Sequence, residues 1–293
     1  MGPSFLKWAG GKAKLGPTVA HLAPASINRY HEPFVGGGGV FFALRAAGRI
    51  ESAALADSNG DLVGTYLTVR DDVEALIASV ENLAKSYLGL GADDRPFFYY
   101  HVRDHWHPTS RITRAARFIF LNKTCYNGLY RVNKRGQFNV PHGRYANPSI
   151  LDATRLRDAS ACLADVDLRT EDFEDACARA APGDLVYLDP PYHPVSETAR
   201  FTNYTKVEFG LDEQLRLRNA FDRLSERGVA ALLSNSDHPA IEGLYGSCWY
   251  EKKVVKMGRS INSAPGKRGA VTELLISNLE HPRVSQPQSS SPK

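Results

Sequence analysis

The sequence Asp189-Pro190-Pro191-Tyr192 follows the apolar run 184–188 and could orient an amino group for attack on an electrophile. Two consecutive prolines fix φ and remove two N–H donors, so the turn is rigid and its carbonyl oxygens stay available. The Asp189 carboxylate and the Pro190 carbonyl could accept hydrogen bonds from the amino group. The Tyr192 ring could stack on the base that carries this group. The alternative interpretation is a rigid strand-to-loop turn with a buried tyrosine.

A second candidate site combines a glycine run with an acidic residue one strand later. Gly36–Gly39 lies between a strand expected at 27–33 and a helix, where backbone can approach a ligand closely. Phe42 stands where a GxGxxG fingerprint needs its last glycine, so a simple chain reversal is the alternative. Asp57 ends the next expected strand, and its carboxylate can accept hydrogen bonds from both hydroxyls of a ribose. The pair indicates a nucleotide-like ligand.

Three other features of the sequence lack residues that their usual chemistry requires. Ala9-Gly10-Gly11-Lys12 resembles part of a phosphate-binding loop, but Leu6 and Ala13 replace the first glycine and the Mg²⁺-binding hydroxyl, which disfavours an ATPase. Three histidines lie within 101–107 without a further ligand, which does not predict zinc. The four cysteines form no CxxC pair, so reduced thiols are expected. We therefore expect no metal.

Positive charge is concentrated in one segment. The chain has 293 residues, 36 basic and 32 acidic, for a formal charge of +4. Between Arg103 and Arg144 nine basic residues accompany one acid, so this segment carries +8 and the rest of the chain −4. Aromatic residues are interleaved, and Tyr126 and Tyr130 flank the turn-like Asn127-Gly128. This pattern indicates nucleic-acid binding rather than a solvated helix face, which usually carries both signs.

The elements that must position these residues alternate between strands and helices. This alternation predicts an α/β core with a largely parallel sheet. The basic segment does not alternate in this way and is interpreted as an insertion, helical to about residue 122 and then looped or hairpin-like. The strands are predicted at 27–33, 53–56, 184–188 and 229–233, with a closing pair at 250–256 and 272–277, and helical segments at 40–47, 61–88 and 211–227.

Composition excludes several classes of protein. Hydrophobic residues make up 43% and charged residues 23%, as in ordinary globular proteins. No apolar run reaches the ~18–20 residues of a membrane helix. The N-terminus lacks the apolar stretch of a signal peptide. We expect a cytoplasmic protein with no membrane partner.

Six segments, taken in order, resemble the Dam-type DNA adenine N6-methyltransferases, the alpha group of the D12 class. The similarity covers most of the chain, from about Phe5 to about Leu279, with the cofactor half first, then target recognition, then catalysis. The segments are FLKWAGGK (5–12), EPFVGGGGVFF (32–42), ADSNGDL (56–62), LNKTCYNGLYRVNKRGQFNVPHGRY (121–145), EDF (171–173) and DPPY (189–192).

The resemblance implies a Rossmann-like S-adenosylmethionine-dependent methyltransferase core with an inserted, mostly helical target-recognition domain that contains a β-hairpin. The core would comprise 1–64 and 150–281, and the insertion 65–149. Independently of the resemblance, the polar, low-complexity composition of residues 282–293 predicts a disordered tail. The cofactor would be S-adenosyl-L-methionine. The substrate would be an adenine flipped out of double-stranded DNA, methylated on N6 by a protein that is monomeric in solution.

The resemblance also implies roles for individual residues. The catalytic motif would be Asp189, Pro190, Pro191 and Tyr192. Cofactor-binding positions would be Trp8, Lys12, Glu32, Pro33, Phe34, Gly36, Gly38, Asp57, Asp172 and Phe173. DNA-binding positions would be Lys7, Lys123, Tyr126, Asn127, Leu129, Arg131, Asn133, Pro141 and Tyr145.

Within the DNA-binding set, the resemblance implies that Tyr126 wedges into the opened duplex. Leu129, Arg131 and Pro141 would read base edges, and Lys7 a flanking base; arginine bidentate to guanine is the commonest specific contact. These matches resemble members that recognise GATC. Two further features are His142, where such members often carry phenylalanine, and residues 259–262, which resemble a loop that closes near the catalytic pocket or DNA.

Two alternatives stay open at this point. An RNA, protein or cytosine N4 methyltransferase shares the amino-group chemistry, but such enzymes commonly carry NPPY or SPPY, and Asp189 and the NGLYR hairpin argue against them. A non-catalytic DNA-binding regulator would keep the scaffold, yet every expected catalytic position is filled. Whether the enzyme acts alone or in a restriction-modification pair is also open.

Overall fold

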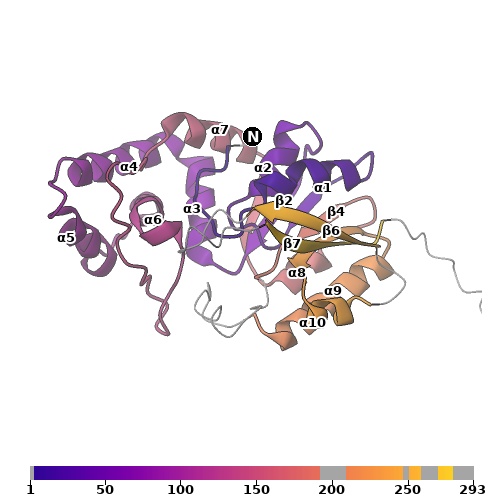
Figure 1. Ribbon diagram of the computed structural model, residues 1–293. Coiled ribbons are helices and arrows are strands. Elements are labelled where there is room, and N and C mark those ends of the chain that lie inside the picture. The colour runs from indigo at the N-terminus through magenta and orange to yellow at the C-terminus, as the bar shows by residue number, and fades with distance from the viewer. Residues whose placement is uncertain (1–2, 192–208, 247–250, 259–269, 280–293) are drawn as a thin grey trace, which may run out of the picture.

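A seven-stranded sheet with the order β3-β2-β1-β4-β5-β7-β6 forms the centre of the protein (Figure 1). The computed structural model describes residues 3–191, 209–246, 251–258 and 270–279. Neighbouring strands among the first five are parallel, whereas β7 runs antiparallel to both β5 and β6. The strands are β1 Tyr30–Glu32, β2 Ala53–Asp57, β3 Val166–Thr170, β4 Leu185–Leu188, β5 Ala230–Ser236, β6 Glu251–Gly258 and β7 Ala270–Ser277. The predicted α/β class with a Rossmann-like sheet is confirmed.

Both faces of the sheet are buried, because alternate residues of its central strands join different cores. In β4, Leu185 and Tyr187 pack with helices α1, α2, α3 and α7, whereas Val186 and Leu188 pack with α8, α9 and α10. Strands buried on both faces are typically continuous apolar runs, so the sequence predicted the apolar strands.

The helices of the core are η1 Ala13–Leu15, α1 Gly16–Leu22, α2 Gly39–Ala46, α3 Gly60–Asp71, α7 Ala153–Leu163, α8 Phe173–Ala178, α9 Leu211–Glu226 and α10 Pro239–Leu244.

The basic segment is part of a helical unit beside one end of the sheet (Figure 1). The elements of this unit are α4 Val73–Leu88, α5 Arg95–Tyr100, the π-helical turn η2 His101–His105, α6 Arg111–Thr124 and the 3₁₀ turn η3 Tyr126–Gly128. After η3 the chain folds back on itself, with antiparallel bridges between Val132 and Phe138 and between Cys125 and His142. We call residues 125–142 the recognition hairpin.

Helix α3 joins the two units, since it packs on α4 and α6 and also on α7 and β3. The domain boundary predicted at 64/65 lies inside this helix, and the division into domains stays a prediction. The helical segment predicted at 61–88 is two helices. It breaks at Asp72, whose φ of −138° and ψ of 39° are not helical.

Several sequence predictions fall on residues that the structure does not describe. These are Tyr192, the loop 259–262 and the tail 282–293. Among the described residues, no helix is both long and apolar enough to cross a membrane.

Candidate active site and nucleic-acid interface

The predicted cofactor and catalytic residues meet at one edge of the sheet. The chain moves outward from β1 through β2 to β3 on one side and from β4 to β5 on the other, so β1 and β4 lie at the topological switch point. Ligands of open α/β sheets bind outside the carboxyl ends of the strands at this point. Glu32 ends β1, Asp57 ends β2, and Asp189 directly follows β4. Buried Pro33 and Pro190 continue two of these ends.

The Asp57 carboxylate is held by two backbone N–H groups. Gly36 donates to Oδ2 at 3.1 Å and Asn59 donates to Oδ1 at 3.0 Å. A carboxylate has about four acceptor positions, so each oxygen keeps one for a ribose hydroxyl. Burial raises the pKa of Asp57 to about 6, against the effect of the two hydrogen bonds. The group is therefore mostly ionised, and able to accept, at neutral pH.

The glycine run forms a cradle that side chains would fill. Gly36 and Gly38 have φ of 46° and 64°, in the left-handed region. A Cβ on Gly36 would lie 2.7 Å from Nε1 of Trp8, and one on Gly38 would lie 2.8 Å from the Tyr66 hydroxyl. That hydroxyl donates to the Gly36 carbonyl at 3.1 Å. Only glycine fits these positions, and the bare backbone permits close approach of a ligand.

Two aromatic rings line the site next to β1 and α8. The rings of Phe34 and Phe173 stack with centroids 5.2 Å apart and an interplanar angle of 27°. The Arg216 guanidinium lies 4.9 Å from the Phe173 centroid and donates to Asp172 at 2.9 Å. Asp172 also caps α8 by accepting from Glu174 N. This apolar wall suits a flat nucleobase, which fits the chemistry of a nucleoside ligand.

The Asp189 carboxylate lies in a charged network. Its Oδ1 accepts from the Ser234 hydroxyl at 2.9 Å and lies 3.8 Å from Nζ of Lys12. Lys12 is buried, and its Nζ is 2.9 Å from both carboxylate oxygens of Glu273. The Ser234 hydroxyl also contacts the hydroxyl of buried Tyr187 at 2.9 Å. Asp189 itself keeps 20% of its side-chain surface exposed, so it remains accessible to a substrate.

The turn after Asp189 is supported from α9. Gln214, fully buried, donates from Nε2 to the Pro191 carbonyl at 3.5 Å, and its Oε1 accepts from Asn235 at 2.9 Å. Sequence reasoning missed Ser234, Gln214 and Glu273. The polar run 234–236, directly after the apolar run 230–233, was the one signal that could have indicated part of this network.

Glu32 is a buried carboxyl whose ionisation is opposed by its surroundings. It is 3% exposed, and its Oε2 accepts from the Tyr30 hydroxyl at 2.8 Å. Burial, with a smaller contribution from the negative charge of Asp189, raises the pKa of Glu32 to about 8. At neutral pH this group is mostly protonated and able to donate a hydrogen bond.

Glu32→Gln is expected to stabilise the ligand-free protein at alkaline pH and to have little effect at acidic pH. Because folding raises the pKa of Glu32 from 4.5 to about 8, the contribution of this group to the free energy of unfolding is fully present below pH 4.5. This contribution is lost as the pH rises through 8. The variant removes this titration, so its free energy of unfolding should exceed that of the wild type by roughly 2–4 kcal/mol at pH 9. Urea unfolding at pH 5 and pH 9 measures the difference. Exposed Glu81→Gln is the control, and equal pH profiles for wild type and Glu32→Gln would contradict the prediction.

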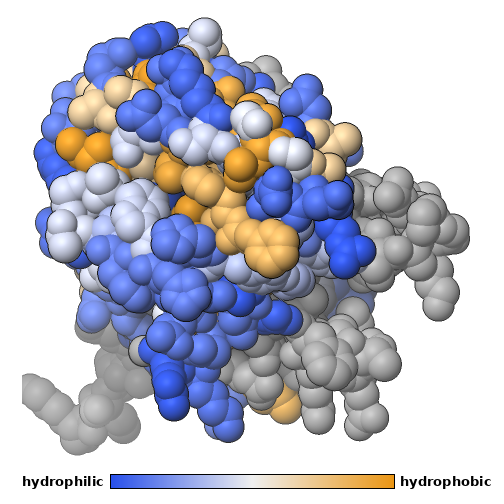
Figure 2. Space-filling model, turned by 90° about the vertical axis from the view of Figure 1, so that its left-hand side faces the viewer, coloured by the Kyte–Doolittle hydropathy of each residue, from blue (hydrophilic) through white to orange (hydrophobic). Residues whose placement is uncertain are grey.

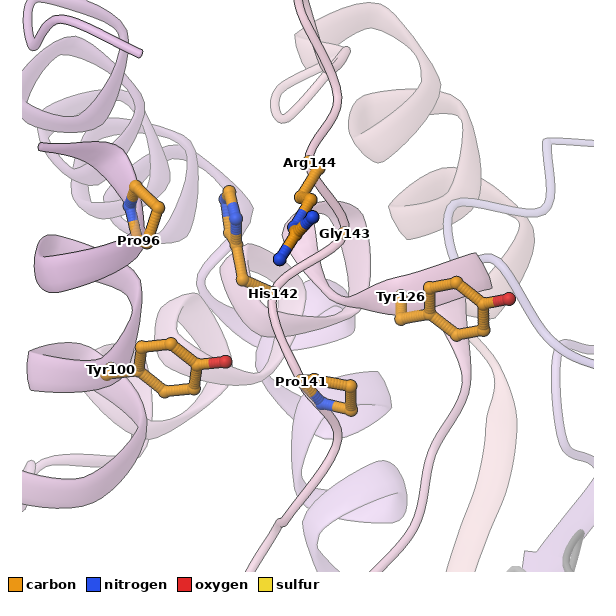
Figure 3. A pocket seen from close by; sticks show the side chains of 7 residues that line it. All are labelled: Pro96, Tyr100, Tyr126, Pro141, His142, Gly143 and Arg144. Atoms are coloured by element: carbon orange, nitrogen blue, oxygen red, sulfur yellow. The ribbon is translucent and has the colours of Figure 1, made fainter. Parts of the chain in front are cut away.

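The predicted wedge residue, Tyr126, lies at the surface of the recognition hairpin. Its side chain is 41% exposed, and the following Asn127 has a φ of 55°, so the turn directs the ring outward. Tyr100, Tyr126 and Pro141 line a cavity of about 480 Å³. In Figure 3, Tyr100 and Tyr126 lie on opposite sides, with Pro141 between them. The backbone N–H of Tyr126 donates to the Pro141 carbonyl at 2.8 Å, which couples the two strands of the hairpin.

Arg131 and Asn133 are partly engaged within the hairpin. Arg131 donates from Nε to Asn139 Oδ1 at 2.8 Å and from Nη2 to the Asn139 carbonyl at 3.2 Å. The Asn133 side chain accepts from the backbone N–H groups of Arg135 and Gln137, so it shapes the hairpin tip. Three of the five Arg131 N–H donors lie outside these two bonds. Any contact of Asn133 with DNA would come in addition to its structural role.

The N-terminal segment lies against the end of α6. The backbone of Lys7 exchanges two hydrogen bonds with the Asn122 side chain, at 2.9 and 2.7 Å. Nζ of Lys7 lies 4.4 Å from the Tyr145 ring centroid and 3.5 Å from the Lys123 carbonyl. Burial, followed by the charge of Lys7, lowers the pKa of Lys123 to about 8. Half-buried Leu129 accepts from the Cys125 thiol through its carbonyl, at 3.3 Å. Lys7, Lys123 and Tyr145 thus lie together at the end of α6.

His142, the last residue of the recognition hairpin, packs against α4 and α5. Its Nε2 lies 2.6 Å from the Tyr87 hydroxyl, and its ring contacts those of Tyr87 and Tyr99. Burial lowers the pKa of His142, with a further contribution from Arg144. A neutral ring here accepts or donates one hydrogen bond that phenylalanine cannot make.

Some basic side chains of this segment form ion pairs and hydrogen bonds within the protein. Arg111 pairs with Asp71 and Asp72 on the α3–α4 junction, and Arg117 donates to the carbonyls of Val102 and Arg103. Lys134 and Arg135, by contrast, are exposed at the hairpin tip. In the part of the chain that the structure describes, no three histidine, cysteine or acidic side chains are grouped as metal ligands would be.

Comparison with known proteins identifies the family. A family model described as D12 class N6 adenine-specific DNA methyltransferase matches residues 8–261. The chain belongs to this class. It is therefore an enzyme that acts on DNA and requires a methyl donor.

Three relatives align with nearly the whole length of this chain. The type II methyltransferase M.MjaIII of Methanocaldococcus jannaschii is 42% identical over 284 residues, which cover 94% of this chain and 98% of the relative. The type II methyltransferase M1.LlaDCHI of Lactococcus lactis subsp. cremoris is 38% identical over 281 residues, 94% of each protein. The DNA adenine methylase of Escherichia coli K12 is 35% identical over 288 residues, 97% of each protein. The match to the D12 class thus extends over the insertion as well as the core.

Proposed function

We propose that this D12 enzyme transfers the methyl group of S-adenosyl-L-methionine to N6 of an adenine flipped out of duplex DNA, within GATC. One observation carries the proposal. The Asp57 carboxylate, the cradle at Gly36–Gly38 and the turn at Asp189-Pro190-Pro191 lie together at the carboxyl ends of β2, β1 and β4. A methyl donor and an amino acceptor can therefore meet between them.

The residues present fit S-adenosylmethionine. Asp57 would accept from both ribose hydroxyls, and the wall of Phe34 and Phe173 would pack on the adenine. Trp8, Lys12 and Glu32 would surround the remaining part of the cofactor near Asp189. The cofactor supplies a methyl group already activated by its sulfonium, so the protein needs to supply neither a metal nor a covalent intermediate.

The task of the protein is then to orient a weak nucleophile. The lone pair of adenine N6 is delocalised into the ring. Hydrogen bonds from N6 to the Asp189 carboxylate and the Pro190 carbonyl would favour a pyramidal nitrogen with a localised lone pair. Ser234 and Lys12 hold the Asp189 carboxylate in place, at 2.9 and 3.8 Å. Positioning of this kind contributes several kcal/mol to rate enhancement.

Recognition of GATC is assigned to the hairpin. Exposed Tyr126 would fill the space left by the flipped adenine, as wedge residues do at other opened duplexes. Arg131 would read a guanine through its remaining donors. Lys7, Leu129 and Pro141 would contact neighbouring base edges from the same surface.

Methylome sequencing of plasmid DNA from a methylation-deficient host that expresses this chain tests the proposal. We expect N6-methyladenine at GATC. N6-methyladenine at another motif would refute the GATC assignment and keep the chemistry. Absence of modified adenine in cells that contain the folded protein would refute the proposal and favour an RNA or protein substrate or an inactive scaffold.

A further inference from the structure

Tyr130 lies where the recognition hairpin meets the cofactor side of the protein. It is half-buried, and its ring stacks on the Trp8 indole with centroids 5.7 Å apart and an interplanar angle of 24°. Phe118 of α6 stacks on the same indole, at 6.5 Å and 20°. Phe138, from the opposite strand of the hairpin, packs on Tyr130 at 5.7 Å. The position of the Trp8 indole thus depends on a hairpin residue.

Trp8 in turn lies against the glycine cradle. Added Cβ atoms on Gly36 and Gly37 would come within 2.7 and 2.9 Å of Trp8 atoms. The indole is therefore in van der Waals contact with the backbone that is proposed to approach the cofactor. A displacement of Tyr130 changes the support of this backbone, because closely packed groups cannot move independently.

A second connection runs through the Tyr130 hydroxyl. It donates to Asn59 Oδ1 at 3.4 Å. The same Asn59 oxygen accepts from the backbone of Asp61 and Leu62 at the start of α3, and the Asn59 N–H donates to Asp57 Oδ1 at 3.0 Å. Tyr130 thus contacts the supports of both the glycine cradle and the ribose-accepting carboxylate.

We propose that Tyr130 is a positioning residue that couples DNA binding at the recognition hairpin to cofactor binding at the glycine cradle and Asp57. The inference rests on the proposed function, because it takes the hairpin to bind DNA and the cradle to bind the cofactor. DNA that orders the hairpin fixes Tyr130, and Tyr130 fixes Trp8 and Asn59. By linkage, the cofactor must strengthen DNA binding by the same factor.

The coupling is measured with S-adenosylhomocysteine, which binds without turnover, and a short GATC duplex. The dissociation constant of S-adenosylhomocysteine is determined by calorimetry with and without saturating duplex. In the wild type we expect the duplex to tighten binding by about 10-fold. Tyr130→Leu keeps apolar volume but loses the flat ring and the hydroxyl, and its coupling factor should fall to about 2 or less. Tyr130→Phe keeps the stack and should retain most of the coupling.

Lys134→Ala is the control, since this residue is exposed at the tip of the same hairpin. It should weaken DNA binding and leave the coupling factor near the wild-type value. Tyr130→Leu should also raise the KM for cofactor in the presence of DNA and change kcat little. An unchanged coupling factor in Tyr130→Leu, or an equal loss in both variants, would overturn the inference. A wild type that neither binds S-adenosylhomocysteine nor methylates DNA would instead refute the proposed function.

Discussion

Asp189→Ala is expected to lower the rate of DNA methylation by about 10³-fold or more, with the fold retained. The substitution removes the carboxylate proposed to orient the adenine amino group. It leaves Lys12 paired with both oxygens of Glu273, at 2.9 Å, so the buried cation keeps a partner. The Ser234 hydroxyl keeps its contact with Tyr187. The loss should therefore be chemical rather than structural.

Single-turnover methylation of a GATC duplex measures this effect, together with equilibrium binding of S-adenosylhomocysteine and of the duplex. Both dissociation constants should stay within about 3-fold of the wild-type values, since the removed group acts on the transition state. Ser234→Ala removes the hydroxyl that donates to Asp189 Oδ1 and contacts the Tyr187 hydroxyl, and it should reduce the rate by about 10-fold. Wild-type turnover in Asp189→Ala would refute the catalytic role of this residue.

The parts of the fold that could be predicted from sequence are those buried on both sides. β4 and the first four residues of β5 form apolar runs, because helices cover both faces of the sheet there. β3, at the edge of the sheet, was missed. Its sequence Val-Asp-Leu-Arg-Thr contains no apolar run, although its alternation of apolar and polar residues is typical of a half-buried strand. The break between α3 and α4 was also missed, since Asp72 interrupts the helix without proline or glycine.

The residues of the candidate site that could be predicted are those that stand next to one another in a sequence motif. Asp189 and Pro190 follow a strand in one motif, and the glycine run precedes a helix in another. Glu273 and Gln214 could not be predicted in this way. They reach the site only because β7 pairs with β5 and because α9 packs under the turn at Pro191. Such long-range pairings leave no local pattern in a single sequence.

The charge balance of the site follows from the same packing. Lys12 is buried between Glu273 and Asp189, at 2.9 and 3.8 Å, whereas Glu32 has its pKa raised to about 8 by burial. The site thus places one lysine beside the acidic side chains of Asp189 and Glu273, near a glutamate whose protonated form is favoured by burial. The excess of negative charge favours a ligand with a positive sulfonium.

Arg131→Ala is expected to weaken discrimination at one guanine of the target by ~1–3 kcal/mol, about 10- to 100-fold in relative affinity. The hairpin should survive, because the bonds of Arg131 to Asn139 are supplemented by backbone pairing of Asn133 with Gln137 and by the contact of Tyr130 with Phe138. Competition binding with GATC and with duplexes changed at one base pair measures the discrimination. Arg131→Lys keeps the charge but not the bidentate geometry and should also lose discrimination.

Arg135→Ala separates base reading from charge attraction. Arg135 lies exposed at the hairpin tip and carries the same charge as Arg131. If it contacts phosphate, its removal should weaken all duplexes alike and reduce the dependence of log affinity on log salt by about one unit. Arg131→Ala should instead change the ranking of the duplexes. Uniform weakening by Arg131→Ala would show that this arginine contributes charge alone, and the reading of GATC would then have to reside in other residues of the hairpin.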